Sequence, residues 1–330
     1  MRDYLIKRLL FTLATVFILS ICIFIIVQAP PGDAIDTIVA NRGAMGDVMT
    51  PEEILALKSM YGFDRPITER YWDWITRFLS GDMGLSVRGQ PVVSLVNEVL
   101  PQTVALSFLT LIVTYLVAIP IGIYSATHQY SFGDYLATGF GFVGLATPGF
   151  LLGIILLYFS YSWFGMSIGG FFSPEMKTAP WSWEKFLDLL SHLWVPVLVI
   201  VFGSTAGTIR TLRATLLDEL GKQYVITARS KGVSWRVLLY KYPVRLALNP
   251  IIASIGGVFP YLLAGQTIVA IVLNLPTLGP LLFDALITQD IALSSSVLLI
   301  MSLLGILGIV VSDVLLAILD PRIRFEKGAQ

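Results

Sequence analysis

The sequence predicts an all-α polytopic membrane protein, and two observations carry this prediction. The chain is 55% hydrophobic and 13% charged, with a mean hydropathy of +0.78, whereas a soluble domain carries about 25% charged residues. Six apolar stretches are also long enough to cross a hydrocarbon core of about 30 Å as helices. None of them alternates in polarity as a barrel strand does, so a bundle of six transmembrane helices is predicted.

The first apolar stretch follows a short basic tip and is predicted to stay in the membrane as an anchor. Its 21 residues exceed the apolar region of a cleaved signal peptide. Cleavage after Val27-Gln28-Ala29 is the alternative, and Pro30 at the next position disfavours it. The predicted spans are Leu9–Ala29, Thr103–Tyr124, Tyr135–Trp163, Leu193–Ile209, Pro250–Leu273 and Ser294–Leu319.

Lysine and arginine gather on one side of these spans. Three lie before the first span, eight lie in residues 210–248 and three follow the last span, whereas residues 30–100 carry six basic and ten acidic side chains. Short loops rich in lysine and arginine stay in the cytoplasm. Both termini are therefore predicted to be cytoplasmic, which requires an even number of spans.

The spacing of the stretches divides the chain into four parts. The long segment after the first span is predicted to be a small helical extracytoplasmic insertion. Thr50-Pro51-Glu52-Glu53 is typical of a helix start, and a second helix is expected over Glu69–Leu79. The four parts are the N-terminal tip with the first helix (1–29), the extracytoplasmic helical loop (30–100), the membrane core with its cytoplasmic loop 210–248 (101–320) and the cytoplasmic tail (321–330).

The sequence predicts no enzyme, metal site or cofactor within this chain. Gly139-Phe-Gly141-Phe-Val-Gly144 matches a dinucleotide-binding pattern, but it lies inside a predicted span and favours close helix packing instead. Gly221-Lys222 is not part of a phosphate-binding loop. Cys22, His128 and His192 have no metal-ligand spacing.

Asp313 is the clear ionisable residue within a predicted span. A carboxylate at mid-membrane costs about 2.5–3.5 kcal/mol on insertion scales. Asp313 lies near the cytoplasmic end of its span, which favours a structural role. An ion-coupled transporter usually needs several such groups, so a secondary transporter is the less favoured alternative.

The cytoplasmic segment 210–248 shows more order than a basic loop requires. Its pattern predicts a helix that continues the fourth span, a short helix from Tyr224, a left-handed turn at Gly232 and a new helix with Ser234 as N-cap. Mixed basic and apolar faces on a helix–glycine–helix favour a docking element for a partner over an ordinary positively charged loop.

At these residues the chain resembles a known family. Ile226-Thr227-Ala228 followed by Gly232 resembles the EAA loop of ABC-importer permeases. The segments Gly84–Pro91 and Thr147–Phe150 and the tail Asp320-Pro321-Arg322-Ile323-Arg324 are similar to the B-type subunit of oligopeptide and dipeptide permeases. The resemblance covers nearly the whole chain.

This resemblance implies a type I ABC importer permease fold. A second permease, usually different, would complete the translocation path, two ATPase subunits would bind ATP and Mg, and an extracytoplasmic binding protein would deliver the substrate. Di- or oligopeptides are the implied substrates, with nickel or oligosaccharides as alternatives. The residues implied to couple the chain to the ATPase are Ile226, Thr227, Ala228, Arg229, Lys231 and Gly232.

Two residue types at the implied coupling loop have separate roles in this interpretation. Arg229 and Lys231 would make polar contacts with the ATPase, and Gly232 would be the backbone pivot. The general family pattern has glutamate where Ile226 stands, so an apolar contact is expected at that position in place of a salt bridge.

Overall fold

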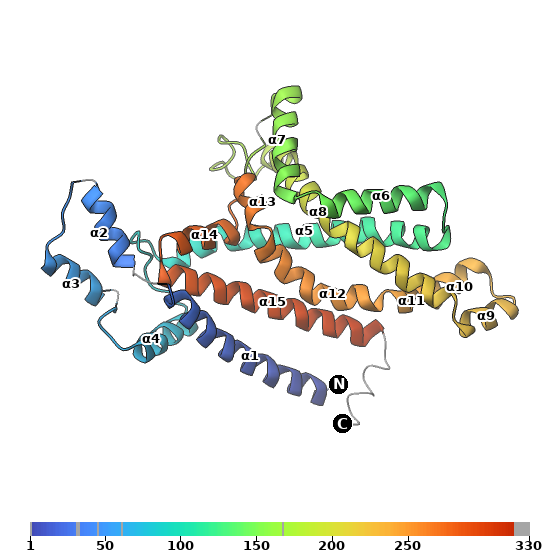
Figure 1. Ribbon diagram of the computed structural model, residues 1–330, viewed down its shortest axis with the longest axis horizontal. Helices are drawn as coiled ribbons and strands as arrows, with labels where there is room; N and C mark the ends of the chain where they lie inside the picture. The colour runs from blue at the N-terminus through green and yellow to red at the C-terminus, as the bar shows by residue number, and fades with distance from the viewer. Residues whose placement is uncertain (1, 31–33, 45, 61, 167, 320–330) are drawn as a thin grey trace. The chain divides into compact units, whose positions relative to one another are not determined.

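The computed structural model describes residues 2–30, 34–44, 46–60, 62–166 and 168–319, and the named elements in this part are all helices joined by loops (Figure 1). In these ranges the only pairing of strand type is an isolated bridge between Leu85 and Pro91. The predicted all-α class is confirmed, while the Asp320–Arg324 motif and the tail 321–330 lie outside the described residues. The elements are α1 (Arg2–Gln28), α2 (Ala34–Ala44), α3 (Pro51–Met60), α4 (Ile67–Ser80), α5 (Val92–Thr127), α6 (Phe132–Ala146), α7 (Gly149–Phe164), α8 (Trp183–Leu220), α9 (Gln223–Ser230), α10 (Trp235–Lys241), α11 (Pro243–Ala247), α12 (Asn249–Pro260), the π-helical turn η1 (Tyr261–Gly265), α13 (Thr267–Val272), α14 (Leu278–Ile287) and α15 (Ile291–Leu319).

Several of these helices are long and apolar enough to cross a membrane. Four qualify singly among the described residues: Leu10–Gln28, Val92–Thr127, Trp183–Leu220 and Ile291–Ile318. Two bent pairs, α6 with α7 and the helices that end at α13, raise the number to six if each pair is one span. The chain is therefore an all-helical membrane protein with four to six candidate spans.

The predicted third span is broken into α6 and α7, which meet at an angle of 99°. Thr147 lies between them in an extended conformation with φ −87° and ψ 118°. A residue that precedes proline is disfavoured in the helical region, so Pro148 ends α6 and allows α7 to start in a new direction. By contrast, α5 and α8 continue through Pro120 and Pro196, so not every proline breaks its helix.

The chain forms two compact units, which share the long helices α5 and α15. Unit 1 contains Met1–Thr103 and Thr277–Leu304, and unit 2 contains Val104–Pro276 and Gly305–Gln330. In unit 1, α4 covers the predicted helix at Glu69–Leu79, and α2 is a further helix that the sequence interpretation left out.

The predicted start of α3 is confirmed in atomic detail. The Glu53 carboxylate accepts hydrogen bonds from the Thr50 backbone N–H at 2.7 Å and from its hydroxyl, while the Thr50 hydroxyl accepts one from the Glu53 N–H. This reciprocal pattern is a capping box. The hydrogen bonds from Thr50 lower the pKa of Glu53.

The core of unit 2 is built around α8, which packs against α6, α7, α11 and α12. One apolar cluster joins the middle of α8 to α13, and a second joins its last turns to α5, α10 and α11. Gly144 of α6 lies so close to α8 that a Cβ there would be 2.9 Å from the Phe202 carbonyl oxygen. The predicted close packing is thus confirmed at Gly144, whereas Gly139 faces open space.

Candidate functional site

The candidate site is the run of short helices that follows the end of α8. Helix α8 ends at Leu220, and α9, α10 and α11 succeed one another with turns of a few residues (Figure 1). The predicted order of helix, glycine turn and helix is confirmed. The segment carries eight basic and two acidic side chains over residues 210–248, so it presents a strong positive charge.

The turn between α9 and α10 is closed by backbone hydrogen bonds around Gly232. Its φ is +79°, a left-handed value that costs L-residues with a Cβ about 1–2 kcal/mol. The Gly232 N–H donates to the Arg229 carbonyl at 3.0 Å, and the Val233 N–H donates to the Ala228 carbonyl at 3.3 Å. These two bonds form a Schellman motif, so glycine defines the angle at which the chain leaves α9.

The predicted coupling residues lie together on α9 and its terminal turn, and most of them face outward. Thr227, Arg229, Lys231 and Gly232 are exposed, Ile226 keeps half of its surface exposed and Ala228 is half-buried. The side chains of Arg229 and Lys231 pair with no acid among the described residues. They are accessible to a partner, and their role in coupling stays a prediction.

Helix α10 contributes exposed apolar side chains that sequence reasoning missed. Trp235, Val237 and Tyr240 are exposed, whereas Leu238 and Leu239 are buried. Val237 precedes the two leucines in the sequence, but its side chain is exposed whereas theirs are buried. The composition of α10 could have indicated these exposed residues, because this seven-residue helix holds more apolar side chains than one of its faces can bury.

The start of α9 is tied to the end of α8 by a carboxylate. Glu219 accepts hydrogen bonds from the Lys222 ammonium at 2.5 Å and from the Tyr224 hydroxyl at 2.6 Å. Burial and the hydrogen bond to Glu219 raise the pKa of Tyr224. The hydroxyl therefore stays protonated and keeps donating to Glu219 at physiological pH.

Beneath the exposed residues, an apolar core fastens the short helices to the base of α8. Leu212 and Leu216 are fully buried against Leu239, Val244 and other members of this cluster. The Thr215 hydroxyl also donates to the Ala247 carbonyl at 3.2 Å. These contacts attach α10 and α11 closely to the last turns of α8.

A buried ion pair connects α8 to the start of α6. The Arg213 guanidinium donates two hydrogen bonds of 2.8 Å to the two oxygens of Asp134, whose residue is only 3% exposed. The Ser125 hydroxyl of α5 and the Tyr130 backbone N–H also donate to this carboxylate. Three elements thus meet at one fully hydrogen-bonded charge.

Asp313 lies half-buried six residues before the end of α15. The neighbouring Ser312 hydroxyl donates to the Ile252 carbonyl of α12 at 2.6 Å, which fixes this part of α15 within unit 2. The structural role of Asp313 stays a prediction. No group of three or more His, Cys, Asp or Glu side chains among the described residues is arranged to hold a metal ion.

Comparison with known proteins identifies the class of this membrane protein. The family described as "Binding-protein-dependent transport system inner membrane component" matches residues 118–325, and the N-terminal part of the same systems matches residues 1–107. The chain belongs to this family. It is a permease component of a binding-protein-dependent transport system, and its family supplies the membrane component and not a catalytic subunit.

Particular relatives align over nearly the full length. The inner membrane ABC transporter permease protein YejB of Escherichia coli O157:H7 is 32% identical, over 99% of this chain and 100% of the relative. The oligopeptide transport system permease protein AppB of Bacillus subtilis is 31% identical, over 98% and 100%. The glutathione transport system permease protein GsiC of Escherichia coli O6:H1 is 30% identical, over 99% and 100%.

A double-mutant cycle with Asp134→Asn and Arg213→Gln should measure a coupling free energy of roughly 2 kcal/mol, because the carboxylate is buried and receives both guanidinium hydrogen bonds. Denaturant unfolding of the purified protein in mixed micelles provides the measurement. The exposed Arg88–Asp284 pair, at 2.9 Å, is the matched control and should give at most about 1 kcal/mol. Equal coupling in the two cycles contradicts the assigned importance of the buried pair.

Proposed function

We propose that this chain is the permease subunit of an ATP-driven, binding-protein-dependent importer of di- or oligopeptides. It would adopt the type I importer fold with six spans and form the translocation path with a second, different permease. The observation that carries the proposal is the ordered, exposed and basic α9–Gly232–α10 element in a chain of this family.

The proposed substrate class, short peptides, is based on the names of the relatives. One is named for oligopeptides and another for glutathione, itself a short peptide. The same machinery could import nickel or oligosaccharides, since the binding protein sets much of the selection. Peptides are favoured because relatives named for them align over almost the entire chain.

Partner ATPase subunits would bind ATP and Mg, and this chain would contribute neither ligand nor cofactor. The ATPase would grip α9 and α10. Ile226 and the outward face of α10 offer apolar contacts, while Arg229 and Lys231 offer charge to acidic side chains of the partner. A docking surface of this composition combines an apolar centre with a polar rim.

Closure of the ATPase dimer would move the permease through α8. The apolar cluster would transmit the displacement of α10 and α11 to α8, and the Asp134–Arg213 pair would carry it to α6 and, through Ser125, to α5. The 99° break before Pro148 lies between α6 and α7 and is a position at which the two helices can change their angle.

The proposed topology has both termini in the cytoplasm and residues 30–100 as an extracytoplasmic insertion. The charge distribution supports this orientation, because the basic segment 210–248 belongs on the cytoplasmic side. An ion-gradient-driven secondary transporter is the rival class. The scarcity of acidic residues within the spans predicted from the sequence, with Asp313 as the clear exception, disfavours it.

Transport should require the partner ATPase. Proteoliposomes with both permeases, the ATPase subunits and the binding protein should take up peptide with ATP present. Omission of the ATPase, or an ATPase variant that binds but does not hydrolyse ATP, should abolish accumulation. Peptide uptake that persists without the ATPase and follows an imposed ion gradient would establish the secondary-transporter class instead.

Gly232→Val should uncouple ATP hydrolysis from substrate delivery, because a β-branched residue at φ +79° strains the turn and redirects α10. The measurement is ATPase activity stimulated by loaded binding protein in the reconstituted complex. Gly221→Val is the matched control, since Gly221 is exposed and has a right-handed φ of −78°. Normal stimulation in the Gly232 variant contradicts its role as a pivot.

Cysteine labelling should reveal the orientation. In a Cys22→Ser background, Met60→Cys should react with a membrane-impermeant maleimide from outside the cell, and Ser230→Cys should react only after permeabilisation. Both positions are exposed, so accessibility reports the side of the membrane. The reverse pattern would overturn the proposed topology.

A further inference from the structure

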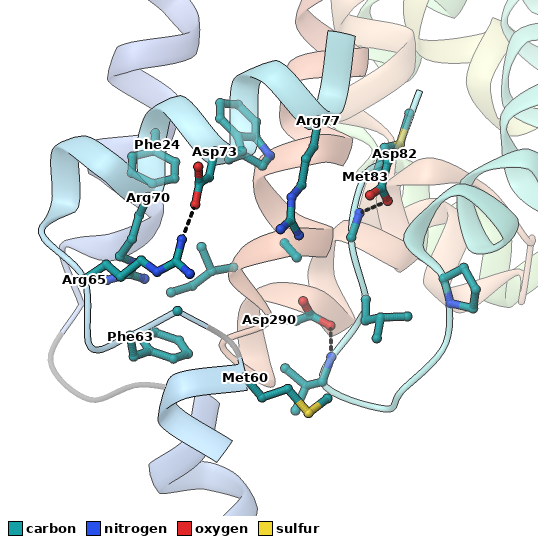
Figure 2. A pocket seen from close by; sticks show the side chains of 18 of the residues that line it. Phe24, Met60, Phe63, Arg65, Arg70, Asp73, Arg77, Asp82, Met83 and Asp290 are labelled. Carbon is teal, nitrogen blue, oxygen red and sulfur yellow. Dashed lines mark hydrogen bonds and ion pairs between the residues drawn. The ribbon is translucent and has the colours of Figure 1, made fainter. Parts of the chain in front are cut away.

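A cavity of about 600 Å³ lies wholly within unit 1 (Figure 2). Its wall is formed by α4 with the chain on either side of it, by the end of α3, by Phe24 of α1 and by the start of α15. Small-molecule sites in proteins have volumes of roughly 300–1,000 Å³. The cavity is therefore large enough for a ligand, and the chemistry of its lining defines which kind.

The lining holds three arginines, and two of them are engaged by the protein. Arg65 forms an ion pair with Asp73 at 2.7 Å, and the Arg70 guanidinium lies 4.5 Å from the centre of the Phe63 ring. The Arg77 guanidinium points into the cavity (Figure 2) and pairs with no acid among the described residues. A carboxylate can therefore reach this planar donor and accept two hydrogen bonds without displacing a protein contact.

The lining also holds three aspartates, and two of these are engaged. Asp73 is the partner of Arg65. Asp290 is buried, and its carboxylate accepts hydrogen bonds from one hydroxyl and two backbone N–H groups. Asp82 is exposed and accepts a bond of 3.0 Å from the Gly84 N–H, while its second oxygen has no donor in the described part of the chain. An ammonium group can bind to that oxygen.

The two remaining charges, at Arg77 and Asp82, are opposite in sign and are held near each other by the backbone. The Asp82 N–H donates to the Arg77 carbonyl at 2.9 Å across the left-handed turn at Gly81. Within the described ranges, however, the two side chains form no ion pair with each other. A ligand with one anionic and one cationic group satisfies both, whereas a ligand of a single sign leaves one charge without a partner.

The lining beside these charges is largely apolar. The Trp74 ring stacks on Phe24 with centroids 5.5 Å apart, and both residues line the cavity together with Met60, Met83 and Leu85. Aromatic rings and methionine side chains adapt to uncharged groups of different shapes. A short peptide combines a free carboxylate, a free ammonium group and side chains of this kind, which a phosphate or a metal ion does not.

We propose that this cavity is a binding site for a short peptide, with the peptide carboxylate at Arg77, its ammonium group at Asp82 and its side chains against Trp74 and the methionines. The choice of a peptide among zwitterionic ligands rests on the proposed function, because peptides are the proposed substrates. The extracytoplasmic location of the site follows from the proposed topology, whereas the requirement for two opposite charges does not.

Equilibrium dialysis of radiolabelled trialanine against the purified complex of both permeases and the ATPase subunits tests the site, without ATP or binding protein. Arg77→Gln should lower the affinity for trialanine at least about tenfold, because it removes a charge-assisted pair of hydrogen bonds. Arg42→Gln, on an arginine of α2 that pairs with Asp47, is the matched control and should bind as the wild type does. Unchanged binding by Arg77→Gln would overturn the proposal.

Peptide analogues test the two ends of the ligand separately. For the wild type, trialanine amide and N-acetyl-trialanine should each bind at least about tenfold more weakly than trialanine. In Arg77→Gln, amidation should cause no further loss while acetylation still does, and Asp82→Asn should show the reverse. A misfolded variant cannot give this crossed pattern. Equal losses from both analogues in both variants, or displacement of trialanine by inorganic phosphate, would overturn the assignment.

Uptake by the reconstituted complex separates this proposal from the proposed function. Proteoliposomes that take up no peptide with ATP and binding protein would contradict the importer function, but the dialysis result with its crossed pattern would stand. Normal ATP-dependent uptake by a complex that binds no trialanine in dialysis would contradict the site alone. The two failures are therefore distinguishable.

Discussion

The buried carboxylate of Asp134 is the interaction on which the order of the candidate coupling region depends. A charge that is 3% exposed is tolerated only when it is paired and fully hydrogen-bonded. Arg213, Ser125 and the Tyr130 N–H meet this condition together. The requirement forces α5, α6 and α8 to meet at one point, and this corner, together with the apolar cluster at the end of α8, gives α9–α11 a firm base.

The coupling region combines a rigid attachment with an exposed surface. Leu212 and Leu216 of α8 pack against α10 and α11, while Ile226 and the outward-facing residues of α10 are exposed. Gly232 defines the angle between α9 and α10 through its left-handed φ. A surface with this construction can pass a push from a partner into the bundle, because the packed core beneath it deforms little.

Unit 1 is organised around helix α4, which packs against α1 and the start of α15. Tyr71, Trp74 and Phe78 form its packed aromatic side, whereas Trp72 and Leu79 are exposed. Its contacts with Ser20 and Ser296 set its depth along two candidate spans. Arg70 and Arg77 of α4 line a cavity within this unit.

The sequence by itself determined the helical class, most of the apolar stretches, the capping box of α3 and the helix–glycine–helix at Gly232. These features depend on local spacing, capping chemistry and the high cost of unpaired backbone groups in lipid. Only the tertiary structure decided which prolines break a helix, which apolar residues of α10 face outward and which acid receives Arg213. Ser131-Phe-Gly-Asp134 is a local capping signal. Asp134 and Arg213, however, are 79 positions apart in the sequence, and only the fold brings them together, because ion pairing depends on distance in space.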